Sequence, residues 1–417
     1  MTGGPPETSA GYLRGLVPAL WPPPASVHIG RARRVRGRDH DDPADDRAYV
    51  LVPSVREPKL LVPAASRRAA AAAVRRATEH RTALARARTA VLSALFRTGT
   101  GGRVFRARLS VHTPDGGTIE DHLGAVLGRP VVLALHLGPP RANRKPVFQV
   151  LGTAGEPLGF AKLGVDPLTR RLVASEAGAL VTLASGTLRG VEVPAVLHHG
   201  RWNGAEVLVQ STLPVWRPRA ADDGTRRIAA MVEVAGVAGV RDEPVDGPYL
   251  AGLTERVDGL GARTGAAGLA AALVAAARTA VTLRVGCWHG DWNAGNLATL
   301  ADRLLIWDWE RFAAGVPLGY DALHHDLQTA ITVRRVPAAE AAGSTVDRAG
   351  ALLAPFGVPA SGAPVVAALY LVELGSRYLA DGQAEAGAPL GALDGWLLPV
   401  LGRLSRELTS TDGDVRR

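Results

Sequence analysis

The segment at residues 287–310 constrains the fold more than any other part of the chain. It reads CWHGDWNAGNLATLADRLLIWDWE: Asp291 and Asn296 stand five residues apart in a polar loop, and Asp308 follows the apolar run LLIW. An Asx-rich turn accounts for the loop by itself, but not for a carboxylate at the end of a buried strand, where an unpaired charge is costly. Carboxylate and amide oxygens are ligands that magnesium prefers. The segment therefore predicts a loop and strand that gather oxygen ligands around a cation and phosphate groups.

The pattern of the chain differs on the two sides of this segment. Upstream, apolar β-prone runs predict strands at 104–112, 131–138, 146–152, 157–164, 191–197 and 204–210, and a helix at about 167–184. After Pro214 the pattern is mostly helical, with helices expected near 219–240, 264–283, 318–333, 363–380 and 389–408. We predict an α+β fold with a helical lobe and a five-stranded lobe, in which the strands from 131 to 210 have one helix inserted after the third and the strand at 104–112 leads into them.

The first hundred residues form a separate extension in this prediction. Residues 1–25 are rich in Gly and Pro and are expected to be loosely ordered. A charged block at 31–46 is either a solvated loop or an anion-binding arm. Two short strands, 48–53 and 59–63, and one long arginine-rich helix, 66–96, complete the extension. The predicted domains are 1–103, 104–213 and 214–417.

The basic residues are unusual in kind. The chain carries 48 Lys and Arg and a formal net charge of +9, but only Lys59, Lys145 and Lys162 are lysine. A large number of basic residues usually points to anionic partners. Here the preference for arginine over lysine is explained by the nucleotide composition of the source genome, so nucleic acid is not the expected partner. A lysine kept where arginine is the default suggests a position that requires lysine.

The cysteine content, the N-terminus and the apolar stretches of the sequence bear on the cellular compartment of the protein. The single cysteine, Cys287, cannot form an internal disulfide, which fits a reducing compartment. The N-terminus does not resemble a secretory signal. The longest apolar stretch, 264–281, is mostly Ala and Gly and contains Arg278, unlike a membrane span. We expect a cytoplasmic protein with no membrane span.

The segment at 287–310 resembles the HGDxxxxN and IDWE motifs of aminoglycoside phosphotransferase-like kinases, the small-molecule relatives of protein kinases. In protein kinases the metal-binding Asp is followed by Phe-Gly. Here Trp309 and Glu310 follow Asp308, as in the small-molecule branch. The resemblance covers roughly residues 105–410 and implies a bilobal protein-kinase-like fold.

The resemblance also implies roles for individual residues. Asp291 would accept or orient the proton of the attacking hydroxyl, and His289 would brace the loop. Asn296 and Asp308 would hold Mg²⁺ against the nucleotide phosphates. Such a kinase needs a lysine on the third strand and a glutamate on the next helix. Lys162 in PLGFAKLG and Glu176, fourteen residues later, have the right order and spacing.

Other nucleotide-binding residues are predicted from their position in the resemblance. The loop at 138–146 takes the place of the phosphate loop, and its Arg144 and Lys145 would donate to the triphosphate; alternatively, this is a solvated basic hairpin tip. Ser211 to Leu213 would be the hinge whose backbone meets the nucleotide base.

Acceptor-binding groups are expected after the metal-binding motif, and the candidates are Glu310, Arg311, Asp321 and His324. The run DALHHD also allows a metal site, but helical spacing scatters its side chains and magnesium chemistry needs no histidine.

These predictions lead to a Mg²⁺-dependent phosphotransferase that uses ATP or GTP and a small-molecule hydroxyl as acceptor, such as an aminoglycoside, a sugar or an amino alcohol. The extension resembles, in placement only, the cap of maltose kinases. The main alternative is a non-catalytic kinase-like protein that binds nucleotide or regulates a partner. A further alternative, a polyanion-binding scaffold on the arginine-rich helix, predicts affinity that falls steeply with salt.

Overall fold

The computed structural model describes residues 8–31, 47–76, 83–114, 116–221 and 224–415. The chain is a mixed α+β protein that divides into two compact units. The first unit contains residues 1–174 and 196–212, and the second contains 175–195 and 213–417. The charged block predicted at 31–46 lies, after Arg31, outside the described residues.

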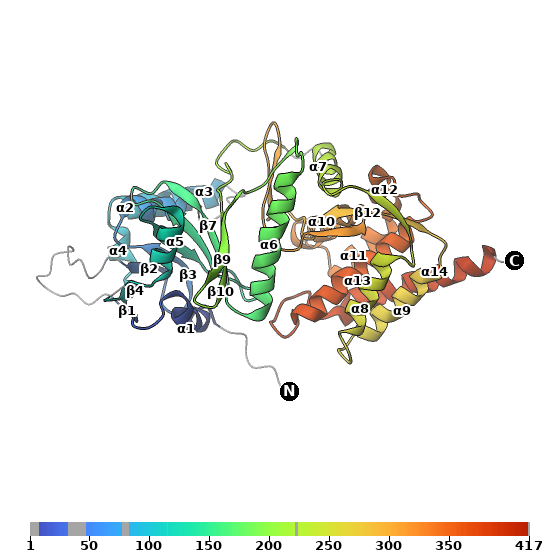
Figure 1. The fold of residues 1–417 in the computed structure, drawn as a ribbon, viewed down its shortest axis with the longest axis horizontal. Coiled ribbons are helices and arrows are strands. Elements are labelled where there is room, and N and C mark those ends of the chain that lie inside the picture. Colours follow the sequence, from blue (N-terminus) through green and yellow to red (C-terminus); the bar gives the residue numbers. More distant parts are fainter. Residues whose placement is uncertain (1–7, 32–46, 77–82, 115, 222–223, 416–417) are drawn as a thin grey trace, which may run out of the picture. The chain divides into compact units, whose positions relative to one another are not determined.

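The first unit is organised around one nine-stranded sheet with the order β1-β4-β2-β3-β5-β6-β7-β10-β9 (Figure 1). Its strands are β1 (Ser26–Arg31), β2 (Ala48–Pro53), β3 (Pro58–Pro63), β4 (Ala107–His112), β5 (Val132–His136), β6 (Val147–Leu151), β7 (Pro157–Gly164), β9 (Val196–Trp202) and β10 (Ala205–Gln210). Every pairing in this sheet is antiparallel. The five strands predicted as one lobe therefore continue into four more strands, and that lobe is not a sheet of its own.

Helices cover parts of both faces of this sheet because successive strand residues point to opposite sides. The helices of this unit are α1 (Ser9–Leu20), α2 (Arg67–Arg76), α3 (Ala83–Arg97), α4 (Gly101–Val104) and α5 (Ile119–Leu127). Leu61 packs in one core cluster with residues of α1 and α5. Its neighbours Leu60 and Val62 pack on the other face with α2 and α3. The alternating apolar pattern thus builds two core layers.

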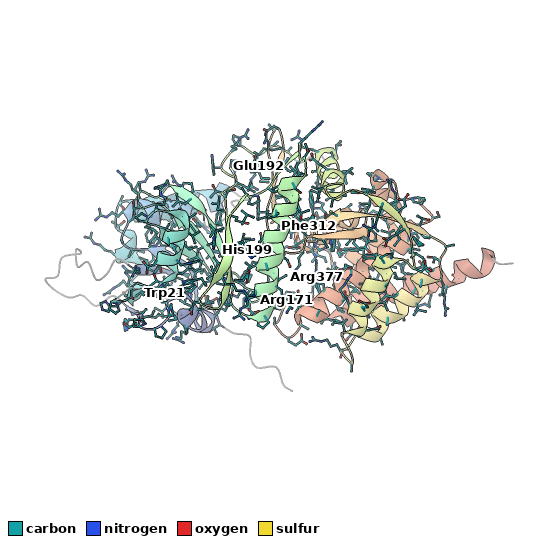
Figure 2. All side chains as sticks on the ribbon, viewed as in Figure 1. Trp21, Arg171, Glu192, His199, Phe312 and Arg377 are labelled. Atoms are coloured by element: carbon teal, nitrogen blue, oxygen red, sulfur yellow. The ribbon has the colours of Figure 1, made fainter. Side chains whose placement is uncertain are left out.

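The N-terminus differs from its prediction as a loosely ordered segment. Residues 9–20 form α1, in which Leu13, Leu16 and Leu20 recur at helical spacing and are buried. Trp21, labelled in Figure 2, is also buried and donates through Nε1 to the Glu120 carboxylate at 3.1 Å. Apolar burial at this spacing outweighs the abundance of Gly and Pro around it.

The long helix predicted at 66–96 is also not a single helix. Helices α2 and α3 pack against each other, and Ser93 Oγ donates to the carbonyl of Ala71 at 2.9 Å. Two residues 22 positions apart lie about 33 Å apart along one straight helix, so this hydrogen bond requires two separate helices that pack together.

The second unit is mostly helical and carries two small sheets. Its helices are α7 (Thr225–Ala235), α8 (Pro248–Asp258), α9 (Ala266–Ala277), α10 (Tyr320–Thr332), α11 (Ala338–Asp347), α12 (Ala349–Leu353), α13 (Ala363–Asp381) and α14 (Leu397–Val415); the last residues of α6 (Pro167–Ser185) also belong to it. Its sheets are β11 (Arg241–Pro244), β12 (Thr282–Trp288) and β15 (Ala313–Pro317), and β13 (Leu297–Thr299), β14 (Leu304–Ile306) and β8 (Val191–Glu192). The segment singled out in the sequence spans the end of β12, a loop, and the β13–β14 hairpin.

One described helix, α13, is long and apolar enough to cross a membrane by length and composition alone. Of its most apolar window, 67% is buried inside the protein. Buried core helices share this length and composition, so the observation is weak evidence for a membrane span.

Candidate active site

The loop at residues 289–296 connects β12 to β13 and is held by its own side chains. The backbone N–H of Asp291 donates to His289 Nδ1 at 3.1 Å. Nδ1 is therefore the unprotonated ring nitrogen, and Nε2 donates to the carbonyl of Trp307 at 3.0 Å. His289 is fully buried. It ties the loop to the end of β14.

Gly290 allows the chain to turn at this point. Its φ of +82° lies in the left-handed region, and a Cβ there would stand 2.3 Å from the carbonyl oxygen of Arg311. The surrounding backbone is fixed from two helices. Asp321 on α10 accepts from the N–H of His289 at 2.7 Å, and Arg377 on α13, labelled in Figure 2, donates to the Gly290 carbonyl at 2.6 Å.

Asp291 presents a carboxylate that is both held and accessible. Its Oδ2 accepts from Asn296 Nδ2 at 2.9 Å, and its Oδ1 lies 3.2 Å from His324 Nε2. Of the side-chain surface of Asp291, 36% is accessible to solvent. Burial raises the pKa of Asp291, but the hydrogen bond from His324 and the positive charge of Arg377 outweigh burial and lower the pKa overall. Asp291 is therefore an ionised acceptor at neutral pH.

Asp308 follows β14 in a conformation that is rare for its residue type. Its φ is +68°, and a residue other than glycine costs about 1–3 kcal/mol in such a region. The turn directs Asp308 into a group of three carboxylates with Glu176 and Glu310, whose oxygens lie within 4.8 Å of one another. The charge of Asp308 also reaches Asp291 and opposes the lowering of its pKa.

The donor set fits a hard cation such as Mg²⁺. Three carboxylates converge at Asp308, and two of them, Glu176 and Glu310, are buried. Asn296 uses its amide nitrogen on Asp291, both on the carboxylate and on the carbonyl at 3.0 Å, which leaves the amide oxygen as the atom able to ligate a cation. Oxygen donors of this kind are what Mg²⁺ selects.

The predicted acceptor-binding residues are more buried than expected. Asp321 uses both oxygens on the backbone of His289 and Gly290, and His324 is fully buried with both ring nitrogens engaged. These two predictions are corrected: both side chains support the loop. Glu310 belongs to the carboxylate group, and Arg311 forms an ion pair with Asp381.

Burial has a direct effect on Asp321. It raises the pKa of this carboxyl to about 6, while the hydrogen bonds from the backbone N–H groups of His289 and Gly290 oppose the rise. An acceptor carboxylate exposed in a cleft would not show this effect to the same degree.

The predicted nucleotide-binding residues of the first unit lie in the central sheet and the β5–β6 loop. Lys162 is buried on β7, opposite Val147 of β6 and Leu208 of β10. Arg144 is almost fully buried, with its guanidinium 3.9 Å from the ring centroid of Tyr12 on α1. This position differs from a solvated hairpin tip. The roles of Lys162, Arg144 and Lys145 stay predictions.

The predicted hinge residues follow β10. Ser211 is half-buried, and Leu213, which begins the second part of the second unit, is buried against Ala298, Leu300 and Leu305 of the same unit. The carbonyl of Leu213 accepts from the N–H of Val215 at 2.8 Å. The nucleotide-binding role of both residues stays a prediction, as does the pairing of Lys162 with Glu176.

Sequence inspection missed several groups that complete this site. Arg377 and Tyr370 on α13 reach the loop at 289–296 directly or through His324, and Asp381 holds Arg311. Helical spacing offered one signal, because Tyr370 and Arg377 stand seven residues apart and so share one face of a helix. Nothing in the sequence connects that face with Gly290.

Solved structures that are similar to this chain are small-molecule kinases. A candidate fructosamine-3-kinase from Thermobifida fusca YX-ER1 has 18% identity and a TM-score of 0.41, and covers 70% of this chain and 99% of that chain. An amicoumacin kinase has 12% identity and a TM-score of 0.36, covering 67% and 88%. A glucosamine kinase has 16% identity and a TM-score of 0.33, covering 72% and 85%. No protein-family model and no curated protein sequence matches the chain.

Proposed function

We propose that the protein is a Mg²⁺-dependent phosphotransferase that moves the γ-phosphoryl group of ATP or GTP to a hydroxyl group of a small molecule. One observation carries this proposal. An accessible, ionised Asp291 is held by Asn296 next to Asp308, where three carboxylates converge. A base beside a cation site is the arrangement that phosphoryl transfer needs.

The residues of the second unit divide the chemistry between them. The oxygen of the acceptor hydroxyl would bond to the γ-phosphorus while the bond between this phosphorus and the nucleoside diphosphate breaks. Asp291 would accept the proton that the hydroxyl loses. Asn296 and Asp308 would hold the cation. Bound Mg²⁺ would neutralise the charge of the phosphates. We also propose that Lys162, Arg144 and Lys145 contribute donors to the nucleotide.

The charge around Asp291 restricts the acceptor. Asp291 feels the negative charge of Asp308, which belongs to the group with Glu176 and Glu310. An anionic acceptor would be repelled there. A neutral or cationic hydroxyl compound, such as a sugar or an amino alcohol, fits better. We place the protein in the cytoplasm, because Cys287 is its single cysteine and is buried as a free thiol.

Nucleotide binding with and without Mg²⁺ tests the proposal. ATP and GTP are titrated by calorimetry into the wild type, Asp308→Ala and Asp291→Asn, and slow hydrolysis is followed with water as acceptor. Asp308→Ala should lose the Mg²⁺-dependent part of binding. Asp291→Asn should keep binding and lose about 10²- to 10⁴-fold in turnover. Asp302→Ala is the matched control, because Asp302 is an exposed carboxylate of the same hairpin that pairs with Arg303.

Each outcome separates one hypothesis from another. Binding without turnover in the wild type, even with a panel of hydroxyl compounds, would support the non-catalytic kinase-like alternative. Neither binding nor turnover with either nucleotide would reject the proposed function. Equal loss in Asp308→Ala and Asp302→Ala would show that general acidity, not the site at Asp308, is responsible.

A further inference from the structure

The buried position of His324 does not suit a residue that binds the phosphoryl acceptor. It stands on α10, has no exposed surface, and uses both ring nitrogens. Nε2 lies 3.2 Å from Asp291 Oδ1, and Nδ1 lies 3.0 Å from the hydroxyl of Tyr370 on α13. A buried histidine placed between a carboxylate and a tyrosine forms a chain of hydrogen bonds that ends on the proposed base.

The partners determine which nitrogen carries the proton. The carboxylate of Asp291 only accepts, so His324 must donate to it from Nε2. In the neutral ring Nδ1 is then the acceptor, and Tyr370 donates to it. Burial lowers the pKa of His324 and raises that of Tyr370, which keeps the ring neutral and the phenol protonated. Tyr370 thus selects the tautomer that can donate to Asp291.

The two donors to Asp291, Asn296 and His324, differ in whether they would also serve the cation. Asn296 donates to Oδ2 at 2.9 Å, but the proposed function asks the same amide to ligate a cation. His324 is held on both sides by protein atoms, so its bond to Oδ1 does not depend on a cation. Two donors on opposite oxygens fix the plane of a carboxylate and point its remaining lone pairs in one direction.

We propose that His324 is a positioning residue, locked in its Nε2–H tautomer by Tyr370, that fixes the carboxylate of Asp291 for the attacking hydroxyl. This rests on the proposed function, in which Asp291 is the base. His324 does not touch the acceptor, so its loss should lower kcat and leave the KM for nucleotide almost unchanged.

Substitutions at position 324 separate hydrogen bonding from packing. His324→Phe keeps the ring volume and removes the donor, and His324→Gln keeps a neutral donor at a similar reach. With Mg²⁺-dependent ATP hydrolysis as the assay, His324→Phe should lower kcat about 10- to 100-fold, the range expected for one hydrogen bond to a charged group. His324→Gln should restore kcat to within about 3-fold. If the two folded variants have equal kcat, the positioning role is wrong.

Tyrosine variants keep the test valid if the changes at position 324 prevent folding. Tyr370→Phe removes only the hydroxyl that faces Nδ1, and kcat should fall about 3- to 10-fold. Tyr249→Phe is the matched control, because it removes a buried hydroxyl that bonds Tyr320 and Glu373 and does not contact His324. Equal kcat in Tyr370→Phe and Tyr249→Phe would overturn the proposal.

A spectroscopic measurement is independent of turnover. Long-range ¹H–¹⁵N correlation spectra of the imidazoles, assigned with His324→Gln, should show His324 as the Nε2–H tautomer, with shifts that change in Asp291→Ala. The Nδ1–H tautomer would contradict the hydrogen-bond chain whether or not the protein is a kinase. Absence of hydrolysis in the wild type, together with the expected tautomer, would instead reject only the proposed function.

Discussion

Two loops that the sequence analysis assigned to phosphate chemistry are held in different ways. The loop at 289–296 is fixed by its own His289 and Asn296 and by α10 of the same unit. The β5–β6 loop is fixed from α1: Tyr12 donates to the carbonyl of Arg144, 132 residues away, and stacks on its guanidinium. The first loop is held by side chains of its own motif together with helices of the same unit, whereas the hydrogen bond and ring contact that hold the second come from α1.

The largest effect should come from the backbone turn of the first loop. Gly290→Ala places a Cβ against the Arg311 carbonyl at a positive φ, and we expect the free energy of unfolding to fall by about 3 kcal/mol or more. Urea unfolding measures this. Gly178→Ala in α6 is the control, because a Cβ there meets nothing within 4 Å, and it should raise stability by about 0.5–1 kcal/mol. Equal stability of both variants would show that the loop is not fixed at Gly290.

The next effect tests the support of this loop from α10. Because the pKa of Asp321 is raised to about 6 when the protein is folded, its contribution to stability is present at low pH and is lost as pH rises from about 4 to 6. About two pKa units correspond to about 3 kcal/mol. Unfolding free energies measured across this range should depend less on pH in Asp321→Asn. Asp347→Asn, an exposed carboxylate paired with Arg403, should keep the wild-type slope.

The smallest effect tests the second loop. Tyr12→Ala removes the ring under Arg144 and the donor to its carbonyl, which together are worth about 1–2 kcal/mol. Trypsin cleavage after Arg144 should become about 5- to 30-fold faster, and less so in Tyr12→Phe. Cleavage after the exposed Arg219, which is followed by Ala220, serves as a control in the same digest and should not change. Unchanged cleavage after Arg144 would mean that α1 does not hold this loop.

This comparison also explains what the sequence could predict. Asp291, Asn296 and Asp308 lie within one segment, so their spacing alone indicated a common site. Arg377 bonds Gly290 from 87 residues away, and no local pattern indicates such a contact. His324 and Asp321 were predicted near the site with the wrong role, because the sequence does not show which side of α10 is buried.

The fold shows the same division between local and distant information. Strand positions at 131–138, 146–152 and 157–164 follow from apolar β-prone runs, and β5, β6 and β7 lie there. Pairing partners do not follow: β4, expected to start the strand-rich lobe, lies between β1 and β2 of the extension. Helix α1 was missed because the composition of residues 1–25 was given more weight than the spacing of its leucines.

The junction between β3 and β5 has a practical consequence for the stability of the protein in solution. Strand β5 pairs with β3 through Leu60–His136 and Leu61–Leu135, and the N–H of Leu137 donates to the carbonyl of Lys59 beside them. This short ladder covers the edge of the strand. Truncated variants that begin near residue 104 lack β3, so the backbone donors and acceptors along that edge of β5 would be exposed beside an apolar surface. Open strand edges of this kind promote intermolecular pairing. We therefore expect proteins that lack the first hundred residues to aggregate more readily than the full chain.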